Sequence, residues 1–239
     1  MMVRSAKAPR ATVEARRGAR QRARGPQRCD GALPRFLFTV RTTRMSIMLD
    51  ENASPVPELL APAGGRAQLE AAVRFGADAV YLAADRFGMR QRAENFALTD
   101  IPDAVAFARA AGSRVFVTMN TLMHAEDLAA LPEYLEAPAA AQVDAFIVSD
   151  LGAFRLAQRH APRVALHVST QASVANAEAA RVWHELGASR VVCAREMSME
   201  DIARMRADAP RELEIEAFVH GAMCMAVSGR SRIRPVTAG

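Results

Sequence analysis

Residues 58–82 read ELLAPAGGRAQLEAAVRFGADAVYL and contain the unit that decides the fold. Two short apolar runs, at 58–60 and 79–82, flank a helical pattern at 66–75. Gly76 follows that pattern at the position where a helix end turns into the left-handed region, which favours glycine. A strand, a helix and a second strand in this order indicate a βαβ unit with two parallel strands.

The same alternation continues as far as residue 218. Further apolar runs lie at 115–119, 145–148, 165–168, 190–193 and 214–218, and helical patterns lie at 101–111, 126–136, 152–160, 175–186 and 198–207. About seven βα units predict an α/β protein with helices outside a parallel sheet. A doubly wound sheet and a TIM-type barrel both fit this rhythm.

Polar residues favour the barrel, because they gather directly after the strands. In a barrel the carboxyl ends of the strands converge on one mouth, where active sites lie. Seven strands are one short of closure, so we expect an incomplete TIM-like barrel with two open edges through which copies of the chain could associate. The polar residues concerned are Asn120, Ser149, Asp150, Ser169, Thr170, Gln171, Arg195, Glu196 and His220.

The first part of the chain has a different composition from the rest. Residues 1–44 hold 12 Lys and Arg against two acids, whereas the remaining chain holds 19 against 24. We therefore divide the chain into a basic low-complexity extension at 1–52, a barrel domain at 53–230 and a tail of different composition at 231–239. A misassigned start, a disordered tail and a targeting peptide all remain open for the extension.

Composition also bears on the partners and the cellular location of the protein. The pI of about 9.8 comes from the extension, so overall charge does not by itself predict nucleic-acid binding. The sequence contains no apolar run of about 18 residues, and no membrane partner is expected. Three scattered cysteines are too few for a disulfide framework, which predicts reduced thiols and a cytoplasmic location.

One face of the fifth predicted strand is polar. His167, Ser169 and Gln171 share that face, because side chains alternate along a strand with period two. Contact with a ligand and a structural hydrogen-bond network are both compatible with this pattern.

Acidic residues mark the last predicted strand, where one face is shared by Glu214, Glu216, Phe218 and His220. Two neighbouring carboxylates separate each other's pKa values and could serve as an acid and a base. Salt bridges to Arg190 or Arg195 are the favoured interpretation.

Other candidates follow the sixth and seventh strands. Arg195 and Glu196 could bind an anionic substrate or hold neighbouring strands together, and the two interpretations are equally supported. Cys193 lies in an apolar strand and is expected to be a buried thiol. Cys224 lies in a loop, where a thiolate could bind a metal or attack a substrate.

Several of these segments together resemble peptidase family U32, the collagenase-like proteases. The similarity runs from about residue 57 to Arg230, and Met89, Arg90, Asn95 and Phe96 most resemble the branch of bacterial tRNA uridine hydroxylation proteins. The segments that carry it are 58–64, 76–81, 167–171, 190–196 and 216–224.

The resemblance implies a TIM-like barrel and, for the intact parent protein, an oxygen-independent hydroxylase that forms 5-hydroxyuridine in tRNA. Such relatives carry an iron–sulfur cluster on four cysteines, act on RNA and are linked to prephenate as the source of the hydroxyl group. A collagenase-like peptidase and a non-catalytic, degenerate barrel are the alternatives. The catalytic candidates are His167, Ser169, Gln171, Arg195, Glu196, Glu216 and His220.

The chain departs from the family pattern near its end. Cys224 matches the first cluster ligand, but Ser231 stands at the position of the second, and the last two ligands would lie downstream. One thiolate cannot hold a cluster that needs four. We therefore expect a C-terminally truncated form without a cluster of its own.

Overall fold

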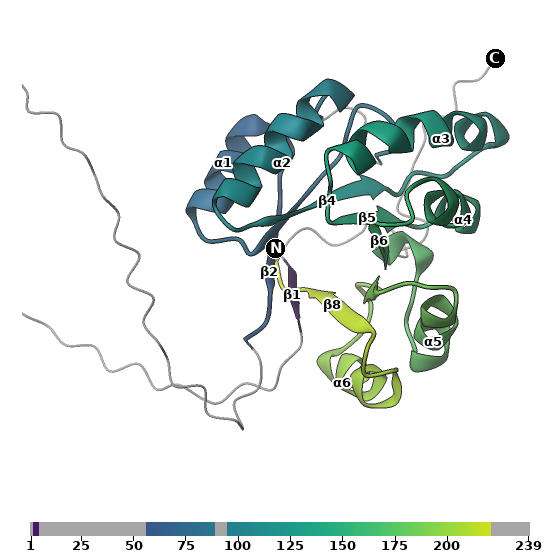
Figure 1. The fold of residues 1–239 in the computed structure, drawn as a ribbon. Coiled ribbons are helices and arrows are strands. Elements are labelled where there is room, and N and C mark those ends of the chain that lie inside the picture. Colours follow the sequence, from purple (N-terminus) through teal and green to yellow (C-terminus); the bar gives the residue numbers. More distant parts are fainter. Residues whose placement is uncertain (1, 5–55, 89–94, 221–239) are drawn as a thin grey trace, which may run out of the picture. The chain divides into compact units, whose positions relative to one another are not determined.

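The computed structural model describes residues 2–4, 56–88 and 95–220 (Figure 1). Cys224, Ser231 and the predicted tail at 231–239 lie outside the described residues, as does the extension at 1–52 apart from residues 2–4. Statements about the fold below refer to the described parts.

Seven parallel strands form the sheet, and each is paired with the next one along the chain. The sequence therefore predicts the parallel, TIM-like arrangement correctly. The strands are β2 (Leu59–Pro62), β3 (Ala79–Leu82), β4 (Arg114–Met119), β5 (Ala145–Val148), β6 (Ala165–Val168), β7 (Arg190–Val192) and β8 (Glu214–Phe218).

A short eighth strand closes the ring. Strand β1 (Met2–Arg4) lies antiparallel between β2 and β8, where Val3 faces Leu59 on one side and Ala217 on the other. Both sheet edges are thus paired, and the expectation of two open edges is wrong for this structure. The sequence gives little warning of it, because three residues of a basic, low-complexity segment carry no strand periodicity.

Helices follow the strands and lie on the outside of the sheet (Figure 1). Gly76, Gly112 and Gly187 follow α1, α2 and α5 with φ of 86°, 82° and 103°, and the prediction for Gly76 is confirmed. The helices are α1 (Arg66–Arg74), α2 (Ile101–Ala110), α3 (Ala125–Ala140), α4 (Leu151–His160), α5 (Ala177–Glu185) and α6 (Met199–Asp208).

Helix α3 is longer than its sequence predicts. The helix was expected to end at Glu136, yet it continues to Ala140 through Pro132 and Pro138. A proline inside a helix costs about 3 kcal/mol. The buried face that includes Leu131 and Pro138 offsets that cost, because packing of an apolar face outweighs local propensity.

The apolar core has two parts. The larger one lies between the sheet and the helices and includes Leu69, Phe146 and Met205. The smaller one fills the interior of the strand ring with Leu60, Ala79, Phe116, Ala145, Ile147 and Val192. The ring interior is therefore packed with side chains, which limits ligand binding to the ends of the strands.

Candidate active site at the strand ends

The middle of the ring interior contains two polar residues. Leu60, Phe116, His167 and Glu216 come from the alternate strands β2, β4, β6 and β8, and each lies two residues beyond the register partner of the one before it. The tilt of the strands in a barrel brings positions with this stagger to one level. Such four-residue layers from alternate strands fill TIM-type barrels. The His167 ring meets the Phe116 ring edge to face, with 4.7 Å between centroids. His167 and Glu216 are each 3% exposed, so this layer buries an imidazole and a carboxyl group.

Below this layer, the strands begin with charged residues that form a buried cluster around Arg190. The Arg190 guanidinium donates to Glu214 Oε2 at 2.5 Å, Glu216 Oε2 at 3.0 Å and Glu58 Oε1 at 3.2 Å. Arg114 also forms an ion pair with Glu58. The prediction that Glu214 and Glu216 pair with Arg190 is confirmed, while Arg195 takes a different place.

Burial shifts the pKa values of both polar residues in the middle layer, His167 and Glu216. Desolvation raises the pKa of the Glu216 carboxyl group, and the adjacent Arg190 opposes that rise. Desolvation lowers the pKa of His167 well below its usual value, and the positive charges of Arg190 and Arg114 lower it further. Among the described residues, neither Glu216 Oε1 nor His167 Nδ1 has a hydrogen-bond partner. The layer therefore holds a neutral imidazole beside a carboxyl group that retains its proton more strongly than usual.

Replacing Glu216 with glutamine is expected to change how stability depends on pH. As the pH rises past the ordinary Glu value of 4.5, the unfolded chain loses this proton but the folded chain keeps it. The wild-type free energy of unfolding therefore falls until the pH passes the raised pKa of the folded state. Glu216→Gln should gain stability relative to wild type as the pH rises from about 4 through the raised pKa of the folded state, measured by urea unfolding at several pH values.

The exposed Glu212→Gln variant is the matched control, and its stability difference from wild type should vary less with pH. A Glu216→Gln difference that stays constant over the same range would show that the folded state does not hold the proton.

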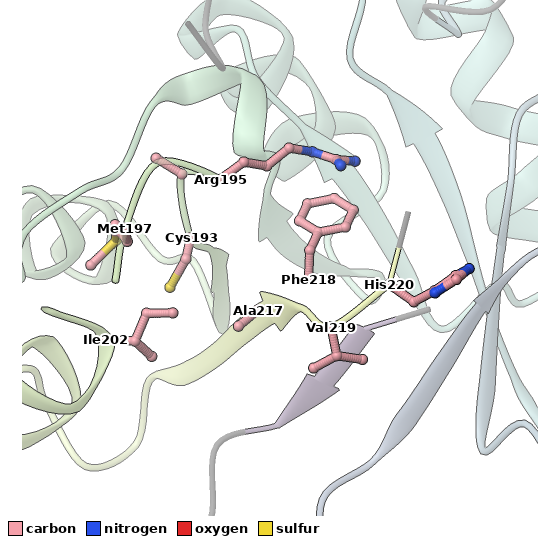
Figure 2. A pocket seen from close by; sticks show the side chains of 9 residues that line it. Cys193, Arg195, Met197, Ile202, Ala217, Phe218, Val219 and His220 are labelled. Carbon is pink, nitrogen blue, oxygen red and sulfur yellow. The ribbon is translucent and has the colours of Figure 1, made fainter. Parts of the chain in front are cut away.

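A pocket of about 180 Å³ lies at the carboxyl ends of β7 and β8 (Figure 2). Active sites of barrel enzymes occupy this end of the strands. The lining comes from the end of β7, the loop and helix α6 that follow it, and the end of β8. The lining residues are Cys193, Ala194, Arg195, Met197, Ile202, Ala217, Phe218, Val219 and His220.

The pocket has a cationic side and an apolar side. The Arg195 guanidinium lies over the Phe218 ring, 3.6 Å from its centroid. In Figure 2, Met197 and Ile202 lie on one side of Phe218, the Arg195 guanidinium lies over its ring, and His220 extends away from the other side. A ligand with a flat apolar part and a negatively charged part matches this division.

Cys193 closes the apolar side of the pocket. Its side chain is buried as predicted, and burial raises the pKa of the thiol to about 12. A thiol that remains protonated is a poor nucleophile and a poor metal ligand. Within the described residues, no group of three or more His, Cys, Asp or Glu side chains could hold a metal ion.

Four of the predicted site residues fall into two groups, and Ser169 lies apart from both. His167 and Glu216 lie in the ring interior, and Arg195 and His220 line the pocket. Ser169 is buried and accepts a hydrogen bond from the Gln171 backbone N–H at 3.3 Å.

Two candidates differ from their predicted placement or lie at the surface. Gln171 does not share the strand face, because β6 ends at Val168 and residues Thr170–Ala172 form a 3-10 turn. Glu196 is exposed. Cys224 lies outside the described residues.

Sequence reasoning missed Glu58 as a partner of Arg190 and Phe218 as a pocket surface. A usable signal exists for the first: Arg114, Arg190 and Glu214 each begin a strand, and Glu58 directly precedes one. In a barrel these positions converge at the amino-terminal end of the strands.

Comparison with known proteins gives a consistent result. A family model described as Peptidase family U32 matches residues 64–237.

In the described part of the chain, no helix has the length and apolar character needed to cross a membrane.

Curated relatives include proteins of RNA modification and a protease. The chain is 44% identical over 174 residues to tRNA hydroxylation protein P1 of Bacillus subtilis, covering 73% of this chain and 41% of that protein. It is 37% identical to tRNA hydroxylation protein P of Escherichia coli, covering 73% and 38%. It is 36% identical to a collagenase of Porphyromonas gingivalis, covering 72% and 44%. The chain thus spans about two fifths of the length of these relatives.

Solved structures agree on the fold. A structure of a U32 peptidase superposes with a TM-score of 0.55 at 19% identity, covering 65% of this chain and 66% of that one. A putative copper homeostasis protein CutC from Streptococcus agalactiae superposes with a TM-score of 0.52 at 14% identity, covering 66% and 85%. At these identities the likeness concerns the fold alone.

Proposed function

Because the chain belongs to Peptidase family U32, we propose that the whole protein takes part in tRNA hydroxylation and forms 5-hydroxyuridine. The observation that carries this proposal is 44% identity to a tRNA hydroxylation protein over most of the barrel. The E. coli tRNA hydroxylation protein, at 37% identity, supports the same activity.

The pocket at the ends of β7 and β8 is the proposed reaction site. It lies at the strand ends where barrel enzymes act, and the Arg195 guanidinium supplies positive charge there. His167 and Glu216 lie deeper, among the packed side chains of the ring. We assign them, with Arg190, a supporting role beneath the site.

An iron–sulfur cluster and a prephenate-like carboxylate remain part of the proposal for the whole protein. Cys224 is the proposed cluster ligand of this chain, four residues beyond His220 in the sequence. Arg195 is the side chain best suited to a carboxylate, since guanidinium groups bind carboxylates in a bidentate manner. Iron and sulfide analysis of the anaerobically purified protein tests the cluster independently of activity.

A peptidase is the second candidate, because the family description and the P. gingivalis relative name that activity. The only cysteine in the described residues, Cys193, is buried with a raised thiol pKa, which does not suit a nucleophile. Release of peptides from gelatin by the purified protein, lost in Cys224→Ala, would favour this alternative.

The test of the proposed function is a gene deletion. Nucleosides from total tRNA of the deletion strain are analysed by liquid chromatography and mass spectrometry. Loss of 5-hydroxyuridine and its derivatives supports the proposal, whereas an unchanged level contradicts it.

A further inference from the structure

The pocket at the ends of β7 and β8 contains a stacked pair of flat groups, the Arg195 guanidinium and the Phe218 ring. The 3.6 Å from the guanidinium carbon to the ring centroid is a cation–π contact, and both side chains line the pocket. Aromatic rings and guanidinium planes are the surfaces on which proteins stack unpaired bases of RNA. Both side chains of the pair are therefore of the kind on which an unpaired base stacks.

The size of the pocket limits what can enter. Pockets for drug-sized ligands range over about 300–1,000 Å³, whereas this one measures about 180 Å³. A single pyrimidine ring fits such a volume, but a whole nucleotide does not. The sugar and phosphate would have to remain outside.

The apolar and charged lining residues suit a base that lies inside the pocket and a phosphate that stays outside it. Met197, Ile202 and Ala217 give the inner lining an apolar character. The Arg195 guanidinium lies over the Phe218 ring and carries the positive charge of the lining (Figure 2). A base could thus enter the apolar part while its phosphates meet positive charge.

We propose that this pocket receives one unstacked pyrimidine base of a single-stranded RNA, which stacks on the Arg195–Phe218 pair. The proposal rests on the proposed function and adds the place where the base binds. An enzyme acting on a base must first take it out of the stack, and RNA loops present bases that are already splayed out.

The test compares two short single-stranded RNAs with the purified full-length chain. One carries a single uridine among adenosines, and the other has an abasic site at that position. Fluorescence anisotropy should show the uridine RNA binding about 10-fold more tightly, the usual size of one stacking contact. Phe218→Leu, which keeps the apolar volume, and Arg195→Lys, which keeps the charge, should each remove most of that difference.

Arg204→Lys is the matched control, because Arg204 is exposed on α6 and does not line the pocket. It should retain the full preference for the uridine RNA. Thermal melting of each variant verifies that the fold is intact.

Equal binding of both RNAs by the wild type, or an unchanged preference in Phe218→Leu and Arg195→Lys, would overturn the inference. Binding of a small carboxylate that is lost in Arg195→Lys, without any effect of the base, would also overturn it and identify an anion site. If the gene deletion abolishes 5-hydroxyuridine while the pocket variants bind RNA as wild type does, the proposed function stands and only this inference fails.

Discussion

Replacing Arg190 with methionine is expected to lower the free energy of unfolding by about 3–5 kcal/mol, the usual cost of removing one partner from a buried ion pair. The Arg190 side chain is 3% exposed and contacts the carboxyl groups of Glu58, Glu214 and Glu216. Methionine keeps a similar length but supplies no charge, so three carboxyl groups lose their shared partner. Arg114 would still neutralise Glu58.

Urea unfolding at neutral pH measures this loss, and Arg204→Met provides the control. Arg204 forms an exposed pair with Asp201, so its replacement should change stability by less than about 1 kcal/mol. The Arg190→Met effect should also shrink in acid, where protonation removes the carboxylate charges. A loss below about 1 kcal/mol at neutral pH would mean that the cluster does not need its central cation.

Replacing Phe116 with alanine is expected to destabilise the protein by about 3–5 kcal/mol, as large-to-small changes in a packed core do. Phe116 is fully buried in the ring interior. Its ring contacts His167 edge to face, and the Arg190 guanidinium lies 5.1 Å from its centroid. Truncation would leave a cavity beneath the proposed reaction site.

The cavity should also change the titration of His167. Burial is the main reason why the pKa of His167 is low, so water entering beside it should raise that pKa toward the usual value. NMR titration of the imidazole protons measures the change. Phe75→Ala is the control, because that ring is 84% exposed and its loss should cost less than about 0.5 kcal/mol. An unchanged His167 titration in Phe116→Ala would contradict this account of its burial.

The sequence predicts the parallel part of the fold closely because its signals are local. Runs such as 79–82 and 145–148 coincide with β3 and β5. The helical pattern at 198–207 agrees with α6 to within one residue at each end. Strand closure by residues 2–4 was not predictable in this way, since pairing between distant segments leaves no local pattern.

The candidate site was only partly predictable for a related reason. Alternation along a strand correctly places Glu216 on the inward face, but it does not distinguish the ring interior from the mouth. Glu58 and Arg190 are 132 residues apart, and only the closed ring brings them together. The stacking of Arg195 on Phe218 depends on side-chain orientation at two strand ends, which sequence spacing does not determine.

The measurement that tests the account most directly is complementation of the gene deletion. The whole gene, carrying Arg195→Lys, Phe218→Leu or the control Arg204→Lys, is returned to the deletion strain, and 5-hydroxyuridine in tRNA is quantified at equal protein levels. We predict that wild type and Arg204→Lys restore the modification and that each pocket variant yields less than about a tenth of it, the size of one lost stacking contact. Full restoration by both pocket variants would contradict the claim that the ends of β7 and β8 form the reaction site.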